Sequence, residues 1–302
     1  GEVYATSFPA GAEALGGAAS LVLLVLCAAA LLLGALSAAA AEKTRVLTID
    51  PMTELLFQFI GGPYVSTASG ASWDDSGRLR VSRAAVMGGA NAALPLYALD
   101  PAQYLEFITG ARRGKNPTAA ERNRANLHYL YPDGVKRGDV DAFYGDPANM
   151  PFTAQQVANA LSELVPARYA YFQRRLGEFN ARLRSVLITG RRLMMGTKVL
   201  CLSERYRLFF AAFGCVVSVP TEEEMRRIRQ ISQASNSKYI ENLAAGLAAG
   251  RLVVVAHDTD PKLRRAVIAR LGAVYIAPPK NEDILFFMHR VLLDVGARLS
   301  RR

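Results

Sequence analysis

The chain has 302 residues, of which 51% are hydrophobic and 21% are charged, and this apolar fraction excludes an intrinsically disordered chain. The length suits two domains, because one domain usually has roughly 100–200 residues. Residues 42–302 hold all 36 Lys and Arg and 24 Asp and Glu, which gives them a net charge of +12. A positively charged surface of this kind can bind an anionic membrane surface or an acidic partner, although it can also be a solvated surface without a partner. No nucleic-acid-binding motif is present.

An uncharged apolar segment, residues 20–41, precedes the rest of the chain. About 20 apolar residues can cross a bilayer, and the small residues at the end of the segment also fit a secretory signal peptide. The residues before it include Glu2 and Glu13 but no Lys or Arg, which is unusual for a signal peptide. We predict that residues 1–41 are a signal peptide or a membrane anchor. Both alternatives place the remainder in the periplasm or another extracytoplasmic space.

The next part of the chain, residues 42–152, is predicted to form an N-terminal α/β lobe. Short apolar runs predict strands, and the longer periodic runs between Gly and Pro residues predict helices. The expected elements are a strand at 44–50, a helix at 52–60, a strand at 64–69, a polar turn at 73–77, a strand at 78–85, a loop at 87–93 and a helix at 100–112.

A strongly helical region follows and is interpreted as a linking helix region, residues 153–190. Its first helix is predicted over 153–164, where Thr153 and Gln156 have the spacing of a capping box. Apolar residues then recur every three or four positions, which predicts a single helix over 169–187 with one apolar face. The residues of this face are Tyr169, Phe172, Leu176, Phe179, Leu183 and Val186.

Residues 191–302 are predicted to form a C-terminal α/β lobe. Strands expected at 198–203, 215–219, 252–256 and 273–276 alternate with helices, an order that indicates a parallel sheet covered on both faces. The predicted fold class is therefore α/β. It has two lobes, each with a parallel β-sheet flanked by helices, joined by one long linking helix and preceded by an apolar N-terminal helix.

Several short motifs follow one another along the chain, and their order is more specific than any one of them alone. They are FYGDP (143–147), PARY (166–169), YRLFFAAFG (206–214), DPKL (260–263) and LGA (271–273). This series resembles the zinc and manganese solute-binding proteins of ABC transporters, with most of their metal ligands replaced. The resemblance implies a ligand held between the lobes, at the carboxyl ends of the strands, and a membrane permease as the partner.

The resemblance also implies four metal-ligand positions, and only one of them carries a donor here. The matching positions are Leu96, Ala142, Glu204 and the neighbourhood of Ala277. The carboxylate of Glu204 is a ligand type that suits both zinc and manganese. A carboxylate at the start of a helix also complements the helix dipole, which is the alternative role of Glu204.

Residues directly after the strand at 252–256 could replace the missing ligands. His257 and Asp258 lie there, and together with Glu204 they form our predicted metal site, for zinc or manganese if any metal is bound. In the alternative, Asp258 and Asp260 cap the next helix and His257 is an ordinary loop residue. Among the other donors, Asp50 and Glu54 follow the first expected strand, and His289 lies on the final helix. Three more lie before the linking region, namely His128, Asp139 and Asp141.

Two functions follow from these patterns. The first is a divergent extracytoplasmic solute-binding protein of a metal-type ABC transporter, which binds a metal or a small solute between two lobes. The alternative is a non-transport accessory subunit that lacks a metal site and docks on a membrane protein complex. The sequence has no GxSxG, HExxH or P-loop motif, so an enzyme is not expected. Cys201 and Cys215 are interpreted either as a disulfide or as two apolar thiols.

Overall fold

The structure is a computed structural model that describes residues 43–49, 51–74, 79–82, 84, 95–98, 127–130, 146–233, 238–279 and 282–301. The predicted apolar segment at 20–41, the loop at 87–93 and the helix at 100–112 lie outside these ranges. The described residues from Thr44 onward belong to one compact unit, Thr44–Arg302. Within the described ranges, no helix combines the length and the apolar character needed to span a bilayer.

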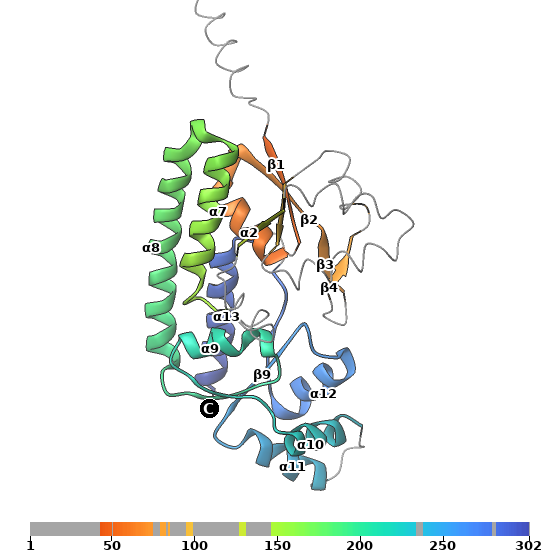
Figure 1. The fold of residues 1–302 in the computed structure, drawn as a ribbon. Helices are drawn as coiled ribbons and strands as arrows, with labels where there is room; N and C mark the ends of the chain where they lie inside the picture. The colour runs from red at the N-terminus through yellow and green to blue at the C-terminus, as the bar shows by residue number, and fades with distance from the viewer. Residues whose placement is uncertain are drawn as a thin grey trace, which may run out of the picture. The chain divides into compact units, whose positions relative to one another are not determined.

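The first lobe is built on a parallel four-stranded sheet (Figure 1). Its strands pair in the order β2-β1-β5-β6, with bounds β1 (Thr44–Thr48), β2 (Val65–Ser69), β5 (Leu96–Ala98) and β6 (Leu127–Tyr129). The helix α2 (Pro51–Gly61) and the short η1 (Gly62–Tyr64) connect β1 to β2. The parallel pairing of β1 and β2 on either side of α2 is a βαβ unit, as the apolar runs predict.

A separate hairpin corrects one prediction in this lobe. The strands β3 (Ala71–Trp73) and β4 (Leu79–Val81) pair antiparallel, with Trp73 opposite Leu79. The polar turn was predicted to begin at Trp73, but Trp73 is the last residue of β3. Trp73 belongs to a strand because it pairs with Leu79 across the hairpin. The polarity of the residues around Trp73 does not indicate this pairing.

Two helices connect the lobes. They are α7 (Met150–Leu164) and α8 (Tyr169–Met194), with η4 (Pro166–Arg168) between them. The 26 residues of α8 make a rod of about 39 Å at 1.5 Å per residue. The predicted apolar face is buried from Phe172 to Val186, and the face continues through Gly190 and Met194, which are also buried. The helix is therefore longer than the predicted 169–187.

The start of α7 differs from the predicted capping box at Thr153. The helix begins at Met150, and Thr153 is buried inside it. Ahead of the helix, the Asp146 carboxylate accepts hydrogen bonds from the backbone nitrogen of Ala148 at 2.9 Å and from Asn149 Nδ2 at 2.7 Å. Because proline is favoured in the first turn, Pro151 at the second helical position marks the start better than Thr153 does.

The second lobe holds another parallel four-stranded sheet, in the order β10-β9-β7-β8. The strands are β7 (Lys198–Cys201), β8 (Val216–Ser218), β9 (Leu252–Ala256) and β10 (Val274–Ile276). The intervening helical elements are η5 (Glu204–Tyr206), α9 (Arg207–Ala212), α10 (Glu222–Gln233), α11 (Lys238–Ala248), α12 (Pro261–Leu271) and α13 (Ile284–Leu299). The two four-stranded parallel sheets and the long helix confirm the predicted α/β class with two lobes.

Alternating side chains of β9 belong to two different apolar clusters. Leu252, Val254 and Ala256 join the larger cluster, whereas Val253 and Val255 join a smaller one with α10, α11 and α12. Successive side chains of a strand point to opposite faces of its sheet. Both faces of the second sheet are therefore buried, as the uninterrupted apolar sequence of β9 predicts.

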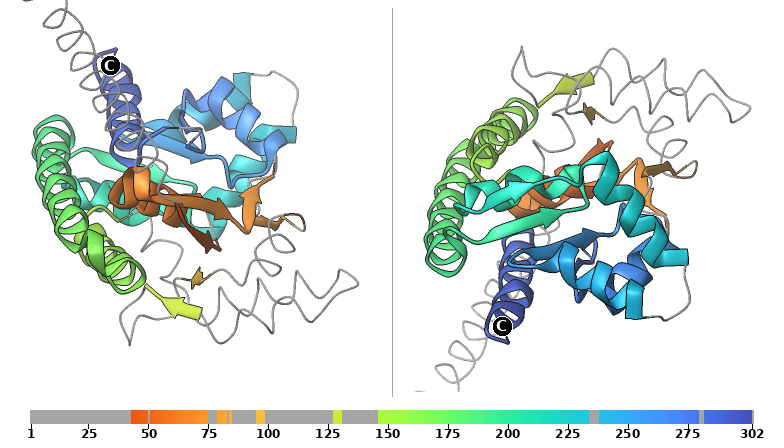
Figure 2. Two further views of the ribbon diagram at one scale, coloured as in Figure 1. Left: turned by 90° about the horizontal axis from the view of Figure 1, so that it is seen from above. Right: turned by 90° about the horizontal axis from the view of Figure 1, so that it is seen from below.

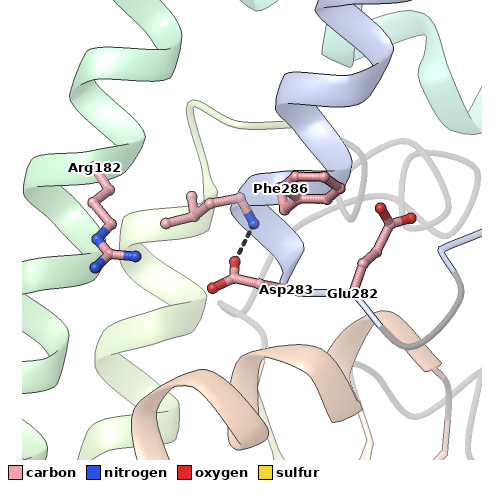
Figure 3. Close-up of a pocket in the computed structure, with 5 residues that line it drawn as sticks. Arg182, Glu282, Asp283 and Phe286 are labelled. Carbon is pink, nitrogen blue, oxygen red and sulfur yellow. Dashed lines mark hydrogen bonds between the residues drawn. The ribbon is translucent and has the colours of Figure 1, made fainter.

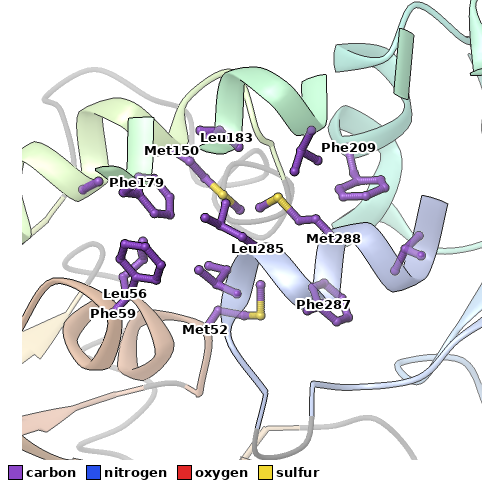
Figure 4. Packing of buried hydrophobic residues seen from close by; sticks show 14 of the residues in the cluster. Met52, Leu56, Phe59, Met150, Phe179, Leu183, Phe209, Leu285, Phe287 and Met288 are labelled. Carbon is purple, nitrogen blue, oxygen red and sulfur yellow. The ribbon is translucent and has the colours of Figure 1, made fainter. Parts of the chain in front are cut away.

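The larger cluster is shared by the two lobes (Figure 4). It contains Phe59 of α2, Phe179 of α8 and Met288 of α13, and the rings of Phe59 and Phe179 meet edge to face at 5.4 Å. Figure 2 shows α7 and α8 lying along one side of the molecule, beside the strands of both sheets. The long helix therefore covers one side of a continuous core that extends from one lobe to the other.

Two glycines of α8 are expected to respond oppositely to alanine. A Cβ atom at Gly190 would clash with the ring of Phe213, whereas a Cβ atom at Gly177 would meet nothing within 4 Å. Overpacking should therefore make Gly190→Ala less stable by about 1–3 kcal/mol. Gly177→Ala should raise the free energy of unfolding by about 0.5–1 kcal/mol, because alanine loses less backbone entropy than glycine when a helix forms. Urea unfolding of both variants checks this, and a shift of the same sign in both would contradict the packing described.

Candidate functional site

Polar residues of the second lobe gather where β7 and β9 end. These strands are parallel neighbours, so the residues that follow Cys201 and Ala256 lie at the same edge of the sheet. There the hydroxyl of Ser203 donates a hydrogen bond to Asp258 Oδ2 at 2.6 Å. The backbone nitrogen of His257 donates to the carbonyl of Ile276 at 3.0 Å, which fixes the loop after β9 to β10.

His257 is a buried, neutral histidine at this edge. Its side chain is only 3% exposed, and Nε2 lies 3.3 Å from the hydroxyl of Tyr206. Burial lowers the pKa of His257 to about 3, with the nearby positive charges of Arg205 and Arg264 adding to the effect. Burial likewise raises the pKa of Tyr206, which remains a neutral phenol. The pair therefore offers hydrogen-bonding groups without net charge.

Trp73, from the hairpin of the first lobe, lies against this histidine. The ring centroids of Trp73 and His257 are 4.9 Å apart, and the guanidinium carbon of Arg205 lies 4.0 Å from the Trp73 ring centroid. Both lobes therefore contribute to the cluster. The sequence interpretation missed Trp73, although a lone tryptophan in a polar segment was a signal that could have drawn attention to it.

The structure brings two of the three predicted metal ligands together. His257 and Asp258 share the edge beyond β9, whereas the Glu204 side chain is 67% exposed and accepts a hydrogen bond from Arg207 Nε at 3.2 Å. Glu204 is the first residue of η5. In the described part of the chain, no group of three or more His, Cys, Asp or Glu side chains is arranged to hold a metal ion.

The remaining candidate donors have other surroundings. Glu54 Oε1 accepts hydrogen bonds from Thr67 Oγ1 at 3.1 Å and from Gln58 Nε2 at 3.3 Å. Asp260 caps α12 by accepting from two backbone nitrogens, which lowers its pKa. His289 is exposed on α13. Outside the described residues or side chains lie Asp50, Leu96, His128, Asp139, Asp141 and Ala142.

The two cysteines of the folded part are free thiols rather than a disulfide. Burial raises the pKa of Cys201 to about 12 and that of Cys215 to about 11. The Cys201 thiol donates to the carbonyl of Ser203 at 3.2 Å, next to the Ser203–Asp258 hydrogen bond. Both thiols therefore stay protonated and act as apolar core groups.

A pocket of about 470 Å³ lies between α8 and the start of α13 (Figure 3). Arg182, Glu282 and Asp283 line it, but each has a partner within the protein. Arg182 pairs with Glu178, Glu282 pairs with Arg290 at 2.6 Å, and Asp283 accepts a hydrogen bond from the backbone nitrogen of Leu285 at 2.6 Å. The pocket is therefore a solvent-filled recess between paired surface groups, and the edge beyond β7 and β9 is the stronger candidate site.

Two parallel sheets joined by one long helix, with side chains of both lobes meeting at strand ends, define a two-lobed α/β fold. Comparison with solved structures gives the same fold. The chain is similar to a zinc-bound deletion mutant of ZnuA, at 14% identity and a TM-score of 0.62, over 86% of this chain and 97% of that one. No protein-family model matches the chain, and no curated protein matches it by sequence.

Two further solved structures cover a similar share of the chain. The periplasmic zinc-binding protein TroA from Treponema pallidum is 14% identical with a TM-score of 0.56, over 85% of this chain and 99% of that one. The SBP FpvC from Pseudomonas aeruginosa, in complex with Mn²⁺, is 11% identical with a TM-score of 0.59, over 86% and 99%. This chain therefore has the fold of zinc- and manganese-binding solute-binding proteins, as the motif series predicted.

Proposed function

We propose that the protein is an extracytoplasmic solute-binding protein of a metal-type ABC transporter, which delivers its cargo to a membrane permease. The observation that supports this most directly is the extent of the structural likeness, because 97–99% of each compared metal-binding protein is matched. The compared structures are metal-binding proteins rather than enzymes. The export segment that we predict at residues 1–41, either cleaved or retained as an anchor, agrees with this location.

The proposed cargo position is the edge beyond β7 and β9, opposite Trp73. A tight zinc site generally has four donors at about 2.0–2.3 Å. His257 and Asp258 supply two protein donors there, while Glu204 is engaged with Arg207. These residues alone therefore hold a bare zinc ion only weakly. We propose a metal that brings ligands of its own, or another small polar solute, as the cargo.

Thermal unfolding with added zinc, manganese or iron, together with metal analysis of the purified protein, tests this proposal. A cargo present at 100–1,000 times its Kd should stabilise the protein by about 3–4 kcal/mol. The substitution His257→Gln should abolish the shift, and the matched control His289→Gln, which changes the exposed histidine of α13, should retain it. A folded protein that shifts with no metal and contains none would contradict a metal cargo. A small polar solute as cargo, or the accessory subunit on a membrane complex, would then be favoured.

A further inference from the structure

The only tryptophan of the chain lies at the proposed cargo position. Trp73 comes from the hairpin of the first lobe, whereas Arg205 and His257, which contact its ring, come from the second. In folds of this type, ligands bind beyond the carboxyl ends of the strands, where Arg205 and His257 are placed. The indole therefore fills space at the same point where cargo is expected to contact both lobes.

Among the described residues, Trp73 Nε1 and His257 Nδ1 at this contact are buried without hydrogen bonds, and so is Thr259 Oγ1 on the loop that follows His257. His257 is 3% exposed and Thr259 is 8% exposed, so water reaches neither side chain freely. A buried polar group without a hydrogen-bond partner destabilises the conformation that contains it, and such groups are rare in native protein cores. A polar cargo could supply the missing partners if the indole moved away.

We propose that Trp73 is a gate residue: its indole occupies the cargo position in the absence of cargo, and cargo binds by displacing it from between Arg205 and His257. This inference rests on the proposed function and specifies how the same site is controlled. The stacking of the indole on the Arg205 guanidinium favours the occupied state. The unpartnered polar atoms favour its release. Cargo affinity is then reduced by the fraction of molecules in which the gate is shut.

The position of the indole can be tested without any cargo, because Trp73 is the sole source of tryptophan fluorescence. In the full chain, acrylamide should quench Trp73 much less than it does in the urea-unfolded protein. The substitution Arg205→Gln removes the stacked guanidinium and should increase quenching. The matched control Arg226→Gln, which removes a guanidinium from α10, should not. A folded wild-type protein quenched as strongly as the unfolded chain overturns the gate.

Displacement is tested by calorimetric titration of Zn²⁺ into the full chain and into Trp73→Ala, with circular dichroism as the check of folding. If Trp73→Ala does not fold, Trp73→Leu takes its place. Zinc serves as the probe because His257 and Asp258 offer it two donors, and we expect weak binding to the wild-type protein. Zinc should bind the variant about tenfold more tightly, as for a gate that is shut in about 90% of wild-type molecules. Equal or weaker binding by the variant overturns the gate. Absence of zinc binding in both proteins counts against zinc as cargo in the proposed function, and the quenching comparison alone then decides the gate.

Discussion

Replacing Phe179 by alanine is expected to lower the free energy of unfolding by about 3–5 kcal/mol, the range found for large aromatic residues in packed cores. The Phe179 side chain is 0% exposed and meets the Phe59 ring edge to face at 5.4 Å. It belongs to the cluster that both lobes share, around α2, α8 and α13. The cavity left by the ring would therefore weaken the packing between the two lobes as well as the packing of α8. Urea unfolding monitored by circular dichroism measures the loss.

The matched control for this substitution is Ile188→Ala on the same helix. Ile188 is 47% exposed, so its truncation should change stability by no more than about 0.5 kcal/mol. The fluorescence of Trp73 gives a second measurement, since it reports on the contact between the lobes. One cooperative transition, with the same midpoint by both probes, is expected for a shared core. Separate transitions for the two lobes, or a small effect of Phe179→Ala, would contradict the shared core.

The apolar face of the long helix shows what periodicity can predict. Spacings of three and four residues identified the buried positions from Phe172 to Val186, and the structure confirms them. The first residue of the pattern, Tyr169, is 58% exposed, because it lies at the end of the helix. The predicted helix ended at residue 187, before Gly190, which has no apolar side chain and is buried because the Phe213 ring packs against it. A close approach between distant segments leaves no periodic signal.

Helix starts were predictable where the capping side chain acts locally. Thr221 Oγ1 accepts a hydrogen bond from the backbone nitrogen of Glu224 at 3.2 Å, and the Glu224 carboxylate accepts one from that of Thr221 at 2.9 Å. Asp260 caps α12 as its position before Pro261 suggested. The same spacing at Thr153 was misleading, because Thr153 is buried within α7. A capping box can be recognised in sequence, but tertiary burial decides whether a threonine caps or packs.

The candidate site was predictable only in part. The sequence placed Glu204 and His257 directly after two expected strands, and the structure shows that these strands, β7 and β9, are parallel neighbours that end at one edge. The contact with Trp73 joins residues 184 positions apart in the chain, and the path between them includes both the hairpin and the long helix. The side-chain direction of Glu204 depends on its pairing with Arg207 in the next turn. The sequence therefore located the sheet edge at which the candidate site lies, whereas the set of residues that meet there could be identified only from the structure.

Acidification is expected to destabilise the protein through His257. The pKa of His257 is lowered to about 3 in the folded chain, first by burial and then by Arg205 and Arg264. In the unfolded chain it should return to about 6.5, so below that pH the unfolded state takes up a proton that the folded state refuses. The contribution of His257 is therefore complete above about pH 6.5 and is lost as the pH falls toward 3. Between about pH 7 and pH 5 the loss should reach about 2 kcal/mol.

Urea unfolding at a series of pH values measures this dependence, and two single substitutions separate His257 from the other titrating groups. His257→Gln should flatten the stability profile between about pH 7 and pH 5, because glutamine takes up no proton in either state. His289→Gln removes a histidine that is exposed on α13, and it should retain the wild-type slope. If His257→Gln kept the full slope, the folded protein would be accepting the proton. This result would contradict the description of His257 as a buried, neutral imidazole beside Tyr206 and Trp73.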